Sequence, residues 1–247
     1  MSAFLRKASR WVSRTPLHPQ WLMGRRRVPG GLDKVSGRVL DIGSADSWIR
    51  THVANSAEYI ALDYPITGMN MYGARPAIFG DGARLPLKDG CIDAVLCLEV
   101  LEHVKDPSAV FREISRVLVP GGRAWISMPF LYPVHDAPHD FQRYTRYALM
   151  RDAEISGLET VALIKRGHCM ESAGLLASLA VTGPILGRSG LIPWVMAPIA
   201  ALFVVVANLT FKGLSWILPD WDGMCIGHEL ELAKPISDFA KGNAADG

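Results

Sequence analysis

Short runs of apolar residues alternate with amphipathic stretches along most of the chain from residue 37 onward. The first run, residues 38–43, ends in a glycine, and the second, residues 59–63, ends in an aspartate. Runs of this length, bounded by turn residues, are typical of buried strands. Strands are predicted at residues 38–43, 59–63, 77–79, 92–98, 124–130, 161–164 and 225–234.

Helices are predicted between several of these runs. Asp106 and Pro107 form a helix start, because aspartate caps the first free amides and proline fits the first helical position. Apolar residues recur with helical spacing over residues 110–118, and Pro-Gly-Gly at residues 120–122 is expected to end this helix. A further helix is expected around residues 147–155. The alternation predicts an α/β, doubly wound (Rossmann-like) fold, with a mostly parallel seven-stranded sheet and helices on both faces.

An apolar helical insert precedes the last predicted strand. Arg188 is the only charged residue in the stretch 172–211, and residues 191–211 form an uncharged run about as long as a bilayer-spanning helix needs. If the last strand rejoins the sheet, the insert cannot cross a membrane once and must return. Two interpretations stay open. The insert is either a hairpin that dips into one leaflet, with Trp194 and Trp216 near the headgroups, or a buried lid or dimer interface.

Charge and cysteine usage refine this picture. No acidic residue occurs before Asp33, and the basic N-terminal arm would favour an anionic membrane surface, although solvent alone also suits it. The net charge of +2 gives no argument for nucleic acid. The four cysteines form no CxxC pair, so a reducing compartment is expected. Arginines interrupt any signal-peptide core, so we expect a cytoplasmic protein at the inner face of the membrane.

These patterns divide the chain into four parts. Residues 1–31 are the basic arm, and residues 32–168 with 219–236 form the α/β domain. Residues 169–218 are the hydrophobic insert, and residues 237–247 are a flexible tail.

A nucleotide-binding pattern follows the first two predicted strands. Asp41, Gly43 and Ser44 come at the end of the first strand, where a glycine lets the backbone approach a ligand closely. Asp63 ends the second strand, 22 residues after Asp41, which suits an acid that binds a ribose diol. A purely structural turn is the alternative. A nicotinamide cofactor is disfavoured, because Gly-x-Gly-x-x-Gly is absent after the first strand.

Five short motifs together carry a family resemblance. They are DIG at residues 41–43, LDY at 62–64, GDGARLPL at 80–87, LEHV at 101–104 and RVLVPGG at 116–122. In this combination the chain resembles the class I S-adenosylmethionine-dependent methyltransferase superfamily, in particular its methyltransferase type 11-like, ubiquinone- and polysaccharide-pathway-like branch. The resemblance covers residues 37 to about 167, plus the strand near residues 225–234.

The resemblance implies S-adenosyl-L-methionine as the cofactor. The implied cofactor-binding residues are Asp41, Gly43, Ser44, Asp63, Asp81, Gly82 and Glu99. Those after the first strand would hold the amino acid end, Asp63 the ribose hydroxyls and Asp81 the adenine amino group, while Glu99 borders the methionine and the substrate. Ala45 departs from the pattern, because a further glycine is common in the first loop, and this puts the loop geometry in question.

A polar loop follows the strand predicted at residues 124–130. Within it, His135, His139 and Asp140 are the candidate catalytic residues, and Tyr132, Asp136, Arg143 and Tyr144 the candidate acceptor-binding residues. Three interpretations stay open. In the first, His135 or His139 is a general base, since histidine titrates near neutral pH. In the second, the histidines and aspartates bind a metal. In the third, the loop is structural, with Asp140 pairing Arg143.

We expect no metal in this loop, because Pro138 interrupts any helix that would place both histidines on one face. His103, in the LEHV motif, is expected to be a packing or capping residue. The sequence therefore predicts an enzyme that methylates a hydroxyl or amine of a membrane-associated acceptor, either a lipid-linked glycan or an isoprenoid-like lipid. The alternatives are a methyltransferase of a soluble small molecule, or a methyltransferase-like binding protein without turnover.

Overall fold

The structure, a computed structural model, describes residues 12–186 and 189–236. Much of the basic arm, Arg188 and the expected flexible tail at 237–247 lie outside the described residues. The chain forms two compact units. The sheet unit comprises Arg27–Pro129, Val134–Ile164 and the segment from His228, and the hairpin unit comprises the segment up to Arg26, Phe130–Pro133 and Lys165–Gly227.

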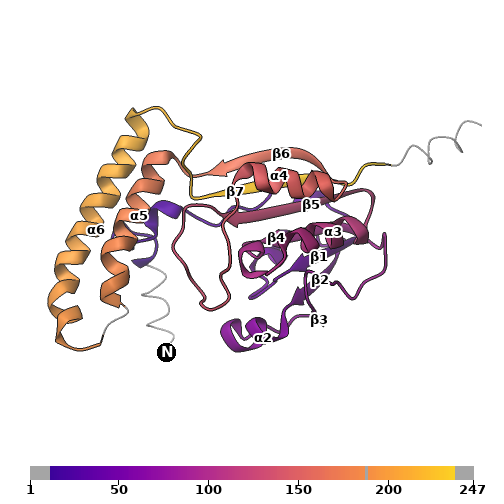
Figure 1. Cartoon of the computed structure of the whole chain (residues 1–247), viewed down its shortest axis with the longest axis horizontal. Coiled ribbons are helices and arrows are strands. Elements are labelled where there is room, and N and C mark those ends of the chain that lie inside the picture. The colour runs from indigo at the N-terminus through magenta and orange to yellow at the C-terminus, as the bar shows by residue number, and fades with distance from the viewer. Residues whose placement is uncertain (1–11, 187–188, 237–247) are drawn as a thin grey trace, which may run out of the picture. The chain divides into compact units, whose positions relative to one another are not determined.

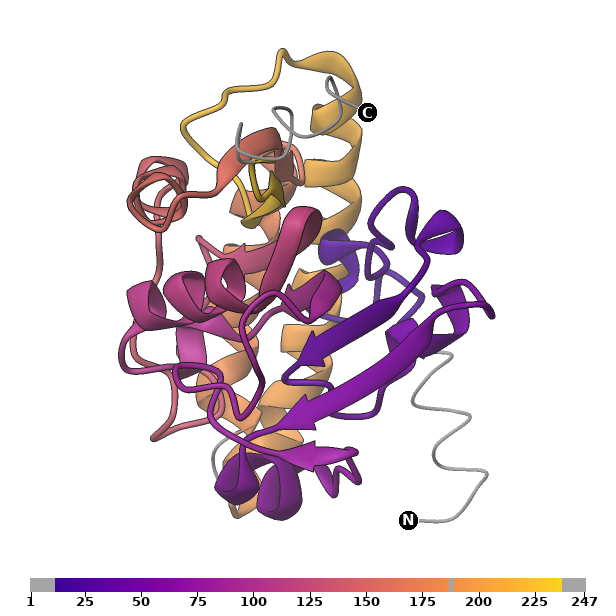
Figure 2. The same cartoon turned by 90° about the vertical axis from the view of Figure 1, so that its right-hand side faces the viewer.

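Seven strands form one sheet in the order β3-β2-β1-β4-β5-β7-β6. They are β1 (Arg38–Ile42), β2 (Glu58–Asp63), β3 (Ile78–Phe79), β4 (Ile92–Leu98), β5 (Leu118–Pro129), β6 (Glu159–Arg166) and β7 (Gly227–Ala233). The first five pair in parallel, and Figure 2 shows β1 and β2 running in one direction. β7 is antiparallel to β5, since the Gly121 amide donates a hydrogen bond to the Lys234 carbonyl oxygen and the Phe130 amide to that of Ile226. The predicted α/β fold with a mostly parallel sheet is confirmed.

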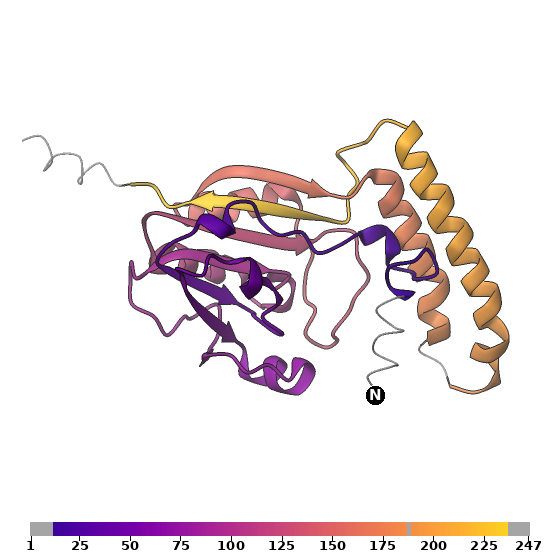
Figure 3. The same ribbon diagram turned by 180° about the vertical axis from the view of Figure 1, so that it is seen from behind.

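Alternating side chains along the strands build a core on each face of the sheet. Leu40 of β1 packs in a cluster with the helices α3 (Pro107–Val117) and α4 (Arg146–Ile155). Val39 belongs to a second cluster with Leu32 and Ile49. These last two come from the short 3-10 helices η2 (Leu32–Lys34) and η3 (Trp48–His52), and short indigo turns lie in front of the strands in Figure 3. Long helices therefore cover one face, and single turns cover the other.

Helix α3 begins as predicted but ends early. Its last residue is Val117, and the following Pro-Gly-Gly lies inside β5. Gly121 has a positive φ of 81°. A Cβ on Gly122 would lie 3.0 Å from the carbonyl oxygen of Asp93, on the neighbouring strand. The glycines therefore allow a close approach between strands, and the prediction that they end the helix is wrong.

In the hairpin unit, α5 (Cys169–Leu186) and α6 (Leu191–Ile217) run side by side (Figure 1). The Ser178 hydroxyl donates to the Asn208 side chain between the two helices. The Asn208 amide in turn donates to the carbonyl oxygens of Pro16 and His18, at 2.7 and 3.0 Å. Part of the expected solvent-facing arm is therefore attached to the hairpin.

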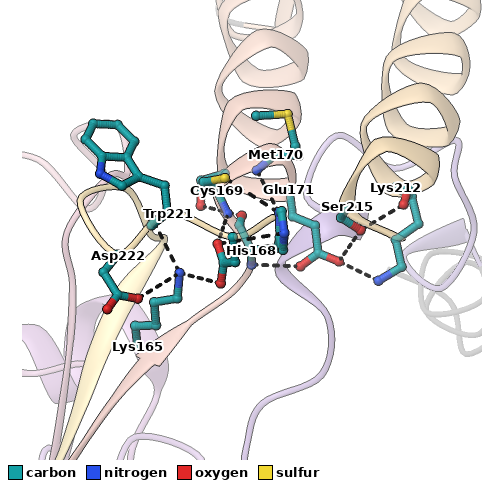
Figure 4. Close-up of polar contacts among 11 residues, drawn as sticks. Lys165, His168, Cys169, Met170, Glu171, Lys212, Ser215, Trp221 and Asp222 are labelled. Carbon is teal, nitrogen blue, oxygen red and sulfur yellow. Dashed lines mark hydrogen bonds and ion pairs between the residues drawn. The ribbon is translucent and has the colours of Figure 1, made fainter. Parts of the chain in front are cut away.

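Charged residues fix the base of the hairpin (Figure 4). Glu171 on α5 accepts hydrogen bonds from Lys212 and Ser215 on α6. Lys165, at the end of β6, pairs with Asp220 and Asp222 in the segment that returns to β7. Both ends of the hairpin are thus held by ion pairs within the same unit.

Candidate functional site

The loop after β1 presents polar groups and a bare backbone. Asp41 is buried and accepts a hydrogen bond from the Tyr59 hydroxyl. Gly43 has a φ of 70°, and a Cβ there would lie 2.4 Å from a methyl group of Val100, so only glycine fits. The Ser44 hydroxyl is buried without a hydrogen-bond partner among the described residues. An unpaired buried hydroxyl next to a glycine turn suits a ligand that supplies the missing contact.

Asp63 connects the ends of the first two strands. One carboxylate oxygen accepts the Ala45 amide at 2.8 Å, and the other accepts the Tyr64 amide at 2.8 Å. Ala45 has a φ of 43°, which explains why glycine is common at this position. Each carboxylate oxygen keeps a further lone pair, so Asp63 is able to accept a ribose hydroxyl.

Burial shifts the ionisation of both acids. Desolvation raises the pKa of Asp41 to about 7, the Tyr59 hydrogen bond opposes this, and the nearby Asp63 adds to it. Burial also raises the pKa of Asp63, against its two backbone amide bonds. A cationic or hydroxyl-bearing ligand would stabilise the ionised form of both carboxyls and so lower their pKa.

Asp81 lies in a turn that α3 holds in place. Its carboxylate accepts the Ala83 amide at 2.8 Å, and a Cβ on Gly82 would lie 3.0 Å from Ile42. Arg116 of α3 donates to the carbonyl oxygens of Leu85 and Leu87, which anchors the segment after the turn. The GDGARLPL and RVLVPGG motifs are therefore parts of one local structure.

The segment after β4 carries a strained residue and a buried acid. Glu99 has a φ of 58°, and its side chain accepts the Ser127 hydroxyl at 2.7 Å. Such strain in a non-glycine residue is often found at functional sites. In the following 3-10 helix, Leu101–His103, Glu102 is fully buried, and neither of its carboxylate oxygens has a hydrogen-bond partner among the described residues. The nearest imidazole nitrogen, His103 Nε2, is 3.8 Å away, beyond hydrogen-bond distance.

The polar loop after β5 is organised around Asp140. Arg143 binds its two carboxylate oxygens at 2.5 and 2.7 Å, and the His135 amide donates to it at 2.9 Å. The Arg143 guanidinium is the main cause that holds the pKa of Asp140 at about 2. Asp140 is therefore ionised near neutral pH and holds the loop.

His135 and His139 of this loop lie near His103 of the LEHV segment. The rings of His103 and His135 are 5.0 Å apart, edge to face. His103 Nδ1 lies 2.8 Å from the carbonyl oxygen of His139, whose amide bonds to Asp136. In the described part of the chain, the His139 imidazole makes no hydrogen bond or ion pair. Burial is the main cause that lowers the pKa of His103, so this ring is neutral at pH 7.

The remaining candidates lie elsewhere. Tyr144 packs against the core and interacts with Asp152 and Ser108. Tyr132 belongs to the hairpin unit and accepts a hydrogen bond from Gln20. The structure thus brings His135, Asp140 and Arg143 together and gives Tyr144 a place in the packing between α3 and α4.

Glu102 and His103 were missed as site residues in the sequence. The signal was a glutamate and a histidine directly after a central strand, where ligands bind in open α/β sheets.

The strand order, with an antiparallel β7 between β5 and β6, defines a class I S-adenosylmethionine-dependent methyltransferase fold. A methyltransferase of this class from Archaeoglobus fulgidus superposes with a TM-score of 0.55 at 17% identity, over 92% of this chain and 99% of the other. The [4+2]-cyclase SpnF also shares the fold, with a TM-score of 0.50 at 19% identity over 94% of this chain and 81% of the other. These similarities establish the fold, and function must be argued from the site.

Residues 40–126 match a family described as "Methyltransferase domain". Residues 40–126 are thus similar to a methyltransferase family whose methyl donor is S-adenosyl-L-methionine.

Two curated relatives fall in quinone pathways by name. The "Ubiquinone biosynthesis O-methyltransferase" of Xanthomonas oryzae pv. oryzae is 30% identical over 141 residues, which cover 51% of this chain and 59% of the relative. The "Demethylmenaquinone methyltransferase" of Mycolicibacterium vanbaalenii is 39% identical over 92 residues, which cover 36% of this chain and 40% of the relative. The similarity thus spans little more than half of the first of these relatives.

Proposed function

We propose that this protein transfers a methyl group from S-adenosyl-L-methionine to a hydroxyl or amine of a membrane-associated acceptor. The observation that carries the proposal is the loop after β1, where Gly43 has no room for a side chain and the buried Ser44 hydroxyl has no described partner. The match of residues 40–126 to a methyltransferase family agrees with this cofactor.

The cofactor would lie across the ends of β1, β2 and β4. Because its pKa is raised, Asp41 would lose a proton when it pairs with the ammonium of the amino acid end. Asp63 has lone pairs that would accept the ribose hydroxyls. Asp81 and Gly82 would border the adenine, and Glu99 the methionine. When bound, the cofactor supplies a methyl group on a sulfonium, and in-line transfer depends mainly on alignment.

The polar loop would receive the acceptor. His135 and His139 are the candidate bases, and the bond network of Asp140 and Arg143 fixes the backbone between them. Asp136, with a positive φ of 51°, and Arg143 would contact the acceptor.

The outer face of α6 supports a membrane partner. Leu202, Val206 and Leu209 are 67%, 55% and 52% exposed, although the opposite stripe of the same helix packs in the hairpin unit. A helix that is apolar all round requires an apolar environment on every side. Among the described helices, Pro193–Ile217 is long and apolar enough to cross a membrane, and only 22% of its most apolar window is buried. Exposed Trp194 and Trp216 near its two ends suit the headgroup regions.

The path of the chain restricts how the hairpin could enter a bilayer. The strands on either side of the hairpin, β6 and β7, are neighbours in one sheet. Both ends of the hairpin therefore stay on the same side, which favours a hairpin that lies along the cytoplasmic leaflet with both tryptophans at headgroup depth. The quinone pathways in the relatives' names also involve lipid-soluble compounds, which supports an isoprenoid-like acceptor.

Calorimetric titration of S-adenosyl-L-methionine and S-adenosylhomocysteine into the detergent-purified full chain tests the cofactor assignment. We expect saturable binding that weakens at least tenfold in Asp63→Asn, because the amide replaces one acceptor oxygen with a donor. Asp33→Asn, an exposed acid on η2, is the matched control and should bind normally. A folded wild-type chain that binds neither compound would refute the enzyme proposal.

A further inference from the structure

The buried carboxyl of Glu102 has no hydrogen-bond partner in the described part of the chain. It is fully inaccessible to solvent, and neither oxygen accepts a hydrogen bond. Burial of a carboxylate without a partner is costly, and such groups are rare unless a ligand completes them. This acid lies directly after the central strand β4, at the end of the sheet where ligands bind.

Two imidazoles lie beside this carboxyl, and each has a polar partner at Nδ1. The ligating atoms of Glu102, His103 and His135 all lie within 4.8 Å of one another. His103 Nδ1 is 2.8 Å from the His139 carbonyl oxygen, and His135 Nδ1 is 3.2 Å from an Asp140 carboxylate oxygen. Metal-binding histidines are commonly oriented in this way, with the ring nitrogen that does not bind metal donating to a carbonyl or carboxylate. With Nδ1 protonated, His103 Nε2 carries a lone pair, and this atom is 3.8 Å from a Glu102 carboxylate oxygen. His135 Nδ1 also lies 3.3 Å from Arg143 Nη2, so the proposal requires the tautomer of His135 in which Nδ1 donates to Asp140 and Nε2 carries the lone pair.

The surrounding charge favours a cation. Glu99, Asp140 and Arg143 act electrostatically on Glu102. Burial is the largest cause that raises the pKa of the Glu102 carboxyl well above its ordinary value, so a cation that binds there displaces a proton. A divalent cation would neutralise this group of charges.

We infer that Glu102, His103 and His135 bind a first-row divalent transition-metal ion, such as Zn²⁺ or Mn²⁺. Two imidazoles and one carboxylate suit these ions better than Mg²⁺, which prefers oxygen ligands. Ligands about 2.1 Å from one ion in tetrahedral geometry are about 3.4 Å apart, so the three side chains need to close by up to about 1.4 Å. Three protein ligands leave coordination positions open for a substrate oxygen.

The use of this ion rests on the proposed function. A hydroxyl oxygen of the acceptor binds the ion, which lowers the hydroxyl pKa, and the proton leaves to His139 or water. The oxygen lone pair then forms the bond to the methyl carbon as the carbon–sulfur bond breaks. The electron pair of that bond stays on sulfur, which gives S-adenosylhomocysteine.

Cobalt titration of the chelator-treated full chain tests the site without any need for turnover. We expect one Co²⁺ to bind with visible absorption bands and to be displaced by Zn²⁺. Glu102→Gln keeps the shape of the side chain and removes its charge. It should weaken Co²⁺ binding by more than the 10- to 100-fold that is typical for loss of an outer hydrogen-bond partner. Unchanged melting temperature and S-adenosylhomocysteine binding in this variant show that it is folded.

A second cluster provides the matched control. His168, Cys169 and Asp220 also lie within ligand distance of one another, at the base of the hairpin (Figure 4). Cys169→Ser should leave Co²⁺ binding unchanged, and the wild-type spectrum should show no thiolate-to-cobalt band. Wild-type affinity in Glu102→Gln, a thiolate band lost in Cys169→Ser, or absence of binding would each overturn the proposal. None of these outcomes bears on cofactor binding, so the two proposals fail separately.

Discussion

At the scale of single residues, Asp41 shows how burial changes the ionisation of a carboxyl. Its carboxyl is buried beside Asp63, with the Tyr59 hydroxyl as a hydrogen-bond donor. Burial is the largest cause that raises the pKa, to about 7, so the free protein carries this group partly protonated at neutral pH. The raised value also means that the free energy of unfolding falls as pH rises from about 4 to about 7, because the folded state then binds more protons than the unfolded state.

Cofactor binding should therefore release a proton from Asp41. The ammonium of S-adenosyl-L-methionine favours the charged carboxylate and lowers its pKa, so a proton leaves at pH values below about 7 and none leaves well above it. Calorimetric enthalpies at pH 6 should then differ between buffers of different ionisation enthalpy. Asp41→Asn should remove this difference. Tyr59→Phe removes the opposing hydrogen bond and should extend proton release to higher pH. Buffer-independent enthalpies at pH 6 in the wild type would contradict the assignment.

His139 is the residue at which proton transfer is best separated from structure. Its imidazole makes no described hydrogen bond or ion pair, whereas its backbone positions His103 and is unaffected by substitution of the side chain. His139→Ala should lower kcat by about 10²- to 10⁴-fold, the usual contribution of a general base, and leave S-adenosylhomocysteine affinity unchanged. Single-turnover methylation of an accepted substrate measures this directly.

His135→Ala should lower kcat as well, but it removes a proposed metal ligand and should also weaken Co²⁺ binding. Normal methylation by both variants would exclude the histidines as bases and leave alignment as the main source of the rate.

At the scale of elements, the strands and their ends were predictable from the sequence. Asp41, Gly43 and Asp63 stand at strand ends because a parallel sheet places every such end at one edge, and spacing alone reveals this. The Pro-Gly-Gly at residues 120–122 was misread, because a glycine that ends a helix and a glycine that admits a neighbouring strand look alike in sequence.

Glu102 could not be assigned for a different reason. A glutamate between leucine and histidine gives no sign of burial, which arises only when the loop after β5 folds over the Leu101–His103 turn. The Phe141 amide bonds to the Glu102 carbonyl oxygen, and Gln142 donates to the carbonyl oxygen of Leu101. These contacts join residues that are about 40 positions apart in the chain. Sequence pattern predicts elements well, whereas such a site depends on two loops that meet.

At the scale of the whole molecule, the chain combines a sheet unit with polar groups and a hairpin unit with a large apolar face. A soluble methyltransferase gains nothing from the exposed apolar stripe on α6, because polar side chains at the same positions would leave the fold unchanged. The proposed membrane partner explains this stripe. It would also let a lipid-soluble acceptor reach the enzyme by diffusion within the bilayer. The competing explanation, a lid or dimer contact, makes the same face inaccessible to lipid.

Two charged substitutions on α6 distinguish these explanations. Leu202→Asp with Leu209→Asp changes exposed positions and leaves the stripe that packs in the hairpin unit intact. One aspartate in a membrane-embedded helix costs about 2.5–3.5 kcal/mol, so the double variant should lose at least 10³-fold in partitioning to vesicles that contain anionic lipid. Vesicle flotation measures this, and Ile155→Asp, at an exposed position on α4, is the control.

Salt separates the two sources of membrane affinity. Arg25, Arg26 and Arg27 would hold the protein to anionic lipid by charge, and that attraction is screened above about 0.5 M salt, whereas apolar insertion is not. We expect the wild type to float both at low salt and above about 0.5 M salt, and the double variant to float under neither condition. If the double variant still floats at low salt only, the basic arm is the anchor. If the wild type never floats and the double variant, but not the control, changes the oligomeric state, the α6 stripe is a contact between copies of the chain.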